Sequence, residues 1–154
     1  VARPDAGLAA SWRFAADAIE FGSRLALPSG TASLVARGPG GLQLLDGSSI
    51  EVAGADVTVA GQRIGTPGGN VILSASQGDV RLLGASSIDV SGAASGGDAG
   101  RLSIFAPMGA LALSTASQLR GSASAGLGGS LEADARELSD FATINRRLEA
   151  GGFS

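Results

Sequence analysis

The sequence predicts an all-β protein: a right-handed parallel β-helix with three short strands per coil and a short helix near the C-terminus. Three observations predict this fold class: short segments rich in Val, Ile and Leu, small or glycine residues between these segments, and recurrence of the same sequence motif along the chain. Each piece is too short for a helix, as expected of strands that end in turns. Recurrence every ~30 to 38 residues indicates units that cannot bury their apolar faces alone and must stack on neighbours.

The clearest repeat lies in residues 69–92, GNVILSASQGDVRLLGASSIDVSG, which holds three apolar pieces. Residues 42–54 (LQLLDGSSIEVAG) and 80–92 (VRLLGASSIDVSG) match at seven of 13 positions, and residues 111–123 form a weaker copy. The first piece recurs at residues 68–75, 99–106 and 128–135. This register predicts one continuous interior, made of Leu42, Leu44, Ile50, Val52, Val71, Leu73, Val80, Leu82, Ile88 and Val90.

The chain is expected to divide into three parts. Residues 1–7 form a linker or frayed end, residues 8–138 form the β-helix coils, and residues 139–154 form a short helix and the start of a further strand. Residues 8–22 are predicted as two strands, although a helix would also place Trp12 and Ile19 on one face. Trp12 is expected to be a core or capping aromatic, the alternative being a platform on which a carbohydrate stacks.

Several further elements follow from local signals. A strand at 33–36 is expected between turns at 28–30 and 38–41. Residues 56–60 (DVTVA) alternate strictly, which predicts a half-buried strand, and 62–69 contain a turn or small excursion. Residues 93–100 read as a projecting glycine-rich loop.

A short amphipathic helix is expected at 140–150, because Leu138, Phe141, Ile144 or Asn145, and Leu148 fall at helical spacing. Ser139 or Asp140 can cap its start by accepting from free backbone amides. Gly151 can end it in a left-handed conformation.

Composition and charge exclude several classes of function. The net charge is −3, from 11 arginines against 14 acidic residues, so no basic face for nucleic acid or anionic lipid is expected. Cysteine is absent, which excludes disulfides and thiolate metal sites. No apolar run approaches the ~18 residues of a membrane span. No signal peptide opens the sequence, so we expect a segment of something longer.

The chemistry available to this chain is narrow. His, Cys, Lys and Tyr are all absent, which removes the usual general bases and nucleophiles, a Ser–His–Asp triad and a zinc site. Carboxylate pairs could still serve a glycosidase, and the candidates are Glu51, Asp56, Asp89 and Asp98. The alternative for Glu51 and Asp89, with Asp46, is that they are solvated outward charges in a strand or turn of the repeat. We therefore predict no catalytic, cofactor or metal site.

Two further motifs are weak. Residues 96–100 (GGDAG) faintly resemble a calcium-binding nonapeptide, but the aspartate is misplaced and no tandem copy follows nine residues later. A flexible turn is therefore the preferred interpretation. Arg146 and Arg147 are expected on a solvated helix face. A P-loop is excluded because the chain has no lysine.

Four segments resemble one family: 79–92 (DVRLLGASSIDVSG), 93–100 (AASGGDAG), 101–107 (RLSIFAP) and 139–154 (SDFATINRRLEAGGFS). They are similar to filamentous-haemagglutinin-type exoproteins of Gram-negative bacteria, the large secreted partners of two-partner secretion. The resemblance covers most of the chain from about Leu8. It lies in the repeat pattern and in short similar segments, and it includes no catalytic motif.

The resemblance implies a structural and adhesive rod segment of a secreted protein at the bacterial cell surface, with a role in cell adhesion and virulence. The implied partners are an outer-membrane transporter of two-partner secretion, a receptor or glycan on a host or neighbouring cell, and neighbouring coils of the same long chain. One alternative is the stalk of a contact-dependent growth-inhibition exoprotein. The other, from a different class, is a polysaccharide-active β-helix enzyme.

Overall fold

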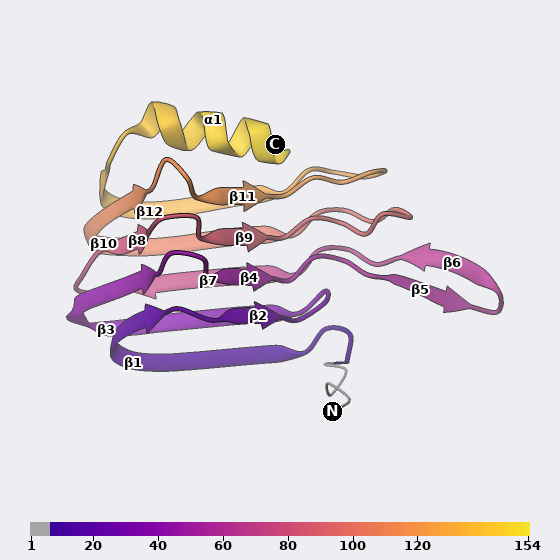
Figure 1. Ribbon diagram of the computed structural model, residues 1–154, viewed down its shortest axis with the longest axis horizontal. Helices are drawn as coiled ribbons and strands as arrows, with labels where there is room; N and C mark the ends of the chain where they lie inside the picture. The colour runs from indigo at the N-terminus through magenta and orange to yellow at the C-terminus, as the bar shows by residue number, and fades with distance from the viewer. Residues whose placement is uncertain (1–6) are drawn as a thin grey trace.

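The computed structural model describes residues 7–154, so the linker expected at residues 1–7 lies almost wholly outside the described residues. The described part is built almost entirely of strands and ends in one helix (Figure 1). The elements are β1 (Ser11–Phe21), β2 (Arg24–Ala26), β3 (Thr31–Leu44), β4 (Ser49–Glu51), β5 (Asp56–Val59), β6 (Gln62–Gly65), β7 (Asn70–Ala75), β8 (Val80–Leu82), β9 (Ser87–Asp89), β10 (Arg101–Leu113), β11 (Gln118–Arg120), β12 (Ser130–Leu138) and α1 (Phe141–Gly151).

The strands form three sheets, two of them entirely parallel. The first has six strands, with the order β1-β3-β7-β10-β12 and with β8 paired to both β3 and β10. The second has the order β11-β9-β4-β2, and the third is the antiparallel pair β5-β6. We call the stretches of chain that stack on one another in these sheets tiers. The first tier contains β1 and β2, and each later tier pairs with the one before it. Figure 1 shows the tiers stacked from β1 to α1.

The prediction of a right-handed parallel β-helix with three short strands per coil is wrong. The finding that overturns it is the closure of the first sheet: β3 pairs with both β7 and β8, and β10 pairs with the same two strands. Four parallel strands therefore form a closed ring of pairings. The ring closes because β3 and β10 are long, 14 and 13 residues, and each continues through a corner. In β3 this corner lies where a turn was expected, at residues 38–41. The all-β content and the C-terminal helix of the prediction are confirmed.

Gly41 shows why the expected turn at 38–41 lies inside a strand. Its φ is +68°, and a Cβ there would collide with the backbone carbonyl of Asp79 in the tier above. Only glycine adopts this conformation at so close an approach without strain. The backbone can therefore bend at the corner and resume pairing at Leu42, which aligns with Val80. The strand predicted at 33–36 is the first half of this longer element.

The predicted register and core are confirmed. Leu42 aligns with Val80 and Ile50 with Ile88, as the 38-residue repeat requires, and Leu111 and Leu119 continue the two columns. All ten residues expected inside are fully buried. Because parallel ladders place equivalent side chains directly above one another, each repeat contributes one layer to a single interior.

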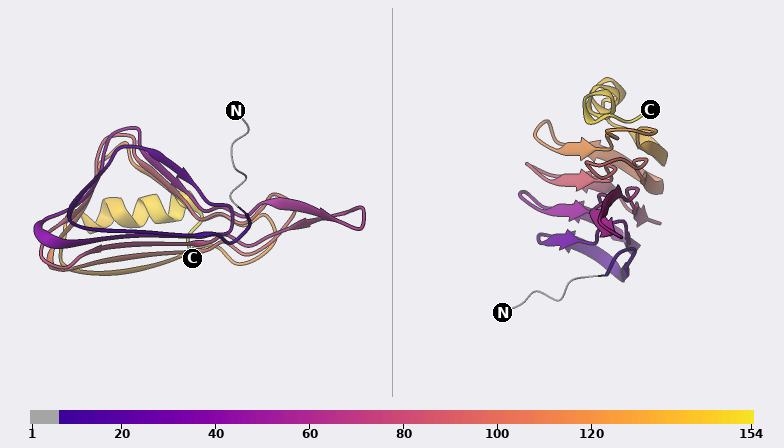
Figure 2. Two further views of the ribbon diagram at one scale, coloured as in Figure 1. Left: turned by 90° about the horizontal axis from the view of Figure 1, so that it is seen from below. Right: turned by 90° about the vertical axis from the view of Figure 1, so that its right-hand side faces the viewer.

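The helix closes the C-terminal end of this interior. Figure 2 shows α1 within the triangular outline of the tiers when the molecule is viewed from below. Ile144 is buried, and Leu148 and Phe153 pack against the core. Asp140 caps the helix as predicted, accepting from the Thr143 amide. The left-handed residue at the other end is Gly152, one position after the predicted Gly151, and Phe141 is exposed rather than part of the apolar face.

The N-terminal end is built on β1, a single strand where two were expected. Phe14 aligns with the buried Leu34, so its side chain lies on the inward side, yet it is 47% exposed because no described element covers the first tier from below. Trp12 is partly buried against the core, stacked on Phe14 at 6.0 Å between ring centroids. The predicted role of Trp12 as a core or capping aromatic is therefore confirmed.

The stacked core generates a prediction at two adjacent leucines. Leu82→Ala is expected to lower the free energy of unfolding by ~2–5 kcal/mol, because it opens a cavity in a fully buried layer. Leu83→Ala is the matched control: Leu83 is 37% exposed, and its truncation is expected to cost less than ~1 kcal/mol. Urea unfolding followed by circular dichroism measures both. Equal losses for the two variants would contradict the assigned register.

Candidate functional site

The most prominent surface feature is the hairpin formed by β5 and β6. Figure 1 shows it extending beyond the loops of the other tiers, and Figure 2 shows it leaving one corner of the triangular outline. Its strands pack mainly on each other. The hairpin tip is Ala60-Gly61, both with positive φ (50° and 79°), which is the two-residue turn that suits the twist of a hairpin.

The hairpin corrects the interpretation of residues 56–60 as a half-buried strand. Val59 is 56% exposed and Ile64 is 48% exposed, so the alternating side chains lie on an arm rather than against the core. The excursion expected in 62–69 is its returning strand. The only local signal for the turn was Gly61 directly after the alternating run DVTVA, which is weak because QRIG does not alternate and Ala-Gly is not among the usual two-residue hairpin turns.

One face of the arm carries three branched apolar side chains together with Gln62, the register partner of Val59. Val57 aligns with Ile64, and Val59 follows Val57 on the same face because side chains alternate along a strand. Thr58 and Arg63 align on the opposite face. We call Val57, Val59 and Ile64 the arm stripe. An isolated two-stranded hairpin is marginally stable in water, so an arm that exposes Val59 and Ile64 and only partly buries Val57 is suited to being covered by another surface.

A hydroxyl clamp fixes the base of the arm. The Thr66 hydroxyl accepts from the Ala55 amide at 2.8 Å and donates to the Ala55 carbonyl at 3.0 Å. The same oxygen lies 2.6 Å from the Ser29 hydroxyl of the neighbouring tier. Asp56, the first residue of the arm, accepts from the Ser95 amide at 3.0 Å. The arm is thus joined to the tiers on both sides, and its direction is set by the body.

Three aspartates connect the tiers, and one of them, Asp46, was expected to be a solvated outward charge. Asp46 accepts from the Ala85 amide at 2.7 Å, and Asp79 accepts from the Ala110 amide at 2.8 Å. Asp98 accepts from the Leu127 amide at 2.8 Å. Each carboxylate sits in a turn or corner and satisfies a backbone donor of the next tier. Their first role is therefore structural.

The carboxylates proposed for a glycosidase do not gather in one groove. Glu51 and Asp89 are register partners on adjacent strands, but Glu51 is paired with Arg24 at 2.9 Å and Asp89 accepts from the Ser91 amide. Asp56 and Asp98 are engaged in their own loops, as described above. Within residues 7–154 no three acidic side chains are placed to hold a metal ion. The weak calcium motif at 96–100 therefore contributes one carboxylate, Asp98, which is already bonded.

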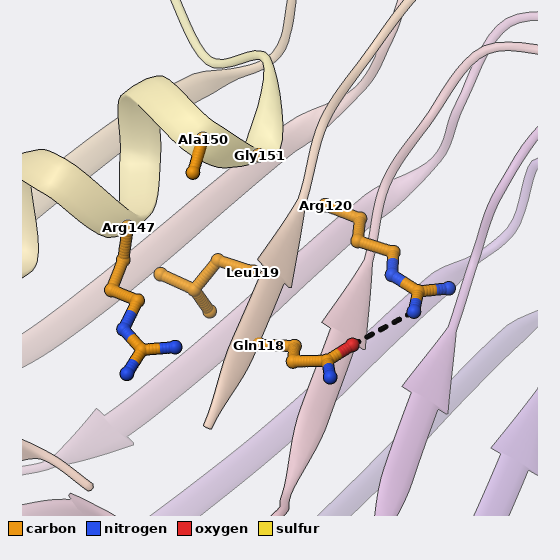
Figure 3. A pocket seen from close by; sticks show the side chains of 6 residues that line it. All are labelled: Gln118, Leu119, Arg120, Arg147, Ala150 and Gly151. Atoms are coloured by element: carbon orange, nitrogen blue, oxygen red, sulfur yellow. Dashed lines mark hydrogen bonds between the residues drawn. The ribbon is translucent and has the colours of Figure 1, made fainter. Parts of the chain in front are cut away.

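A shallow hollow of ≈ 300 Å³ lies between α1 and β11. Figure 3 shows Leu119 at its centre, with Arg147 from the helix on one side and Arg120, bonded to Gln118, on the other. Arg147 donates to the Ser117 carbonyl at 2.8 Å, so it anchors the helix instead of lying on a solvated face as expected. Arg146 is exposed as predicted.

No family model, curated protein or solved structure matches this chain. Among the described residues, no helix is long and apolar enough to cross a membrane.

Asp79 provides a pH-dependent test of the bonds between tiers. The Ala110 amide and then Arg81 hold the pKa of Asp79 below its usual value. A lowered folded pKa stabilises the protein above the unfolded pKa of ~3.9, and this contribution is lost as pH falls through the folded value. Asp79→Asn is expected to cost ~1 kcal/mol at neutral pH, since the side chain is partly exposed and screened.

The difference between wild type and Asp79→Asn should shrink in denaturant melts as pH falls below ~4. Asp134→Asn serves as control, because Asp134 is exposed on β12 and its side chain connects no tiers within residues 7–154. A constant difference across pH would show that the charge of Asp79 contributes nothing.

Proposed function

We propose that this chain is a structural and adhesive segment of a secreted filamentous-haemagglutinin-like bacterial surface protein, and that the arm formed by β5 and β6 makes the adhesive contact. The observation that carries the proposal is the arm itself. It extends from an otherwise regular stack and exposes the arm stripe, while its base is clamped by Thr66. The sequence resemblance supports the cellular setting, at the surface of a Gram-negative bacterium.

The division between body and arm supports a display role. The body has a core in which side chains from successive tiers are fully buried, so it holds its form without a ligand. The arm contributes none of the buried core residues. Its apolar face therefore gains from contact with a partner surface. The partner we propose is a protein receptor on a host or neighbouring cell.

An apolar stripe favours a protein receptor over a glycan as the ligand of the arm. Burial of a branched side chain such as Val59 contributes roughly 1.5–3 kcal/mol. A glycan platform would use an exposed aromatic ring, and the arm has none. The stalk of a contact-dependent growth-inhibition exoprotein remains the alternative role, and it needs no binding arm.

Shortening the arm tests the adhesive role. Replacing residues 58–63 by Asn-Gly joins Val57 to Ile64 through a two-residue turn of the preferred type, while leaving Asp56 and Thr66 in place. We expect this variant to fold and melt like wild type but to lose binding to target cells, measured by flow cytometry with labelled protein. Undiminished binding would contradict the role of the arm.

Single substitutions separate the two faces of the arm. Val59→Ser should weaken cell binding about tenfold or more, the affinity equivalent of one buried branched side chain. Arg63→Gln, on the opposite face of the same hairpin, is the matched control and should leave binding unchanged. Equal effects of the two substitutions would remove the apolar stripe from the proposal.

The enzyme alternative has its own test. We expect the purified protein to show no turnover in a screen of polysaccharides, since Glu51 and Asp89 are each engaged in structural bonds. Turnover that Glu51→Gln or Asp89→Asn abolishes, while both variants fold normally, would replace the adhesive role by a catalytic one.

A further inference from the structure

Three arginines line two adjoining hollows on one side of α1. The first is the hollow of ≈ 300 Å³ over Leu119, which Arg120 and Arg147 border (Figure 3). The second has a volume of ≈ 330 Å³ and includes Arg146 in its lining. The two hollows share Arg147 and Ala150, so they form one continuous surface beside the helix. We call this surface the arginine groove, with Arg120, Arg146 and Arg147 as its cations.

The arginine groove is a local excess of positive charge in a chain whose net charge is −3. Neither hollow has an acidic residue of the described chain in its lining. The salt bridges found among residues 7–154 involve Arg24 and Arg81, and neither includes an arginine of the groove. Unpaired cations gathered on one surface favour an anionic ligand.

Two carboxylates close to the groove are already bonded elsewhere. Asp89 is the register partner of Arg120, but its carboxylate accepts from the Ser91 amide at 2.9 Å. Asp140 accepts from the Thr143 amide at 3.1 Å as the cap of α1. Both carboxylates have a structural role, so the groove arginines have no counter-charge of their own.

Two of the guanidinium groups are oriented in advance. Arg147 donates to the Ser117 carbonyl at 2.8 Å, and Arg120 donates to the side-chain oxygen of Gln118 at 2.7 Å. Each bond fixes one nitrogen of a guanidinium and leaves its other N–H groups without an acceptor among residues 7–154. Because these side chains are already held, binding costs less side-chain entropy. The planar N–H fork of arginine matches a carboxylate with two parallel hydrogen bonds.

The length of the groove suits an extended peptide. Along α1 the groove runs from Thr143 to Gly151, which is ~12 Å at the helical rise of ~1.5 Å per residue. An extended peptide advances ~3.3 Å per residue and places alternate side chains on one face, ~7 Å apart. About four peptide residues therefore span the groove and present two carboxylates to it. No aromatic residue of the described chain lines the groove, so a sugar ring would find no stacking platform there.

We propose that the arginine groove binds an extended acidic peptide segment of a partner protein. Carboxylates on alternate residues of that segment engage Arg120 and Arg147 on either side of Leu119. Arg146 lengthens the contact along α1. The site is built from α1, β11 and the turn before β11, so it does not depend on the role proposed for the arm.

Fluorescence anisotropy with a labelled peptide in which glutamate alternates with glycine tests the proposal on the unmodified chain. We expect saturable binding that weakens severalfold as salt rises from ~0.05 to ~0.5 M, because exposed charges are screened. The same peptide with glutamine in place of glutamate should not bind. Arg120→Gln and Arg147→Gln should each weaken binding of the glutamate peptide about threefold, the equivalent of one exposed ion pair.

Arg37→Gln is the matched control, because it removes the same charge from an exposed residue at the corner of β3 and should leave binding unchanged. Circular dichroism checks that each variant folds. Arg120→Gln keeps the test decisive if Arg147→Gln loosens α1, since Arg120 makes no bond to the helix among residues 7–154.

Three outcomes overturn the proposal. The first is no saturable binding of the glutamate peptide. The second is an equal loss for Arg37→Gln and Arg120→Gln, since general attraction to positive charge would then account for the binding. The third is binding of inorganic phosphate or dextran sulfate as tight as that of the peptide, which would remove an acidic peptide as the ligand of the groove.

Discussion

In-register stacking of equivalent side chains is the constraint on which this structure depends. Each parallel ladder sets one residue above its counterpart in the next tier, so the column Leu42, Val80 and Leu111 shares one line through the core. A slip of one residue in any ladder would turn a buried side chain outward. The glycine corners, the carboxylates between tiers and the C-terminal helix all preserve this alignment.

The register of the strands and the residues of the interior could be predicted because the repeated sequence motifs determine both. The Ser-Ser-Ile motif at 48–50 and 86–88 fixes which residues pair, and the pairing of Ile50 with Ile88 follows from spacing alone. The closed ring could not be predicted in this way. Whether the backbone keeps pairing through a corner depends on the left-handed conformation of Gly41 and its approach to Asp79, and apolar periodicity contains no information on either.

The candidate site was harder to predict than the core for a related reason. Val57 and Val59 alternate with polar residues whether the strand rests on a core or projects into solvent, so the pattern predicts a strand without its surroundings. Asp46 and Asp79 pose the same difficulty, because the amides that donate to them lie more than thirty residues away in sequence. Helical spacing placed Phe141 on the buried face, but the helix turns Ile144 to the core and leaves Phe141 exposed.

The orientation of the tiers has a mechanical consequence. The backbone hydrogen bonds that join tiers run along the stack, from β1 at one end toward α1 at the other. Tension applied along that axis pulls on these bonds in line and separates the tiers one after another. Tension applied at the tip of the arm acts across the stack and reaches the body through Thr66 and Ser29. It loads the ladders on either side in shear, where many bonds share the force at once, so a load applied at the arm strains the protein in its stronger direction.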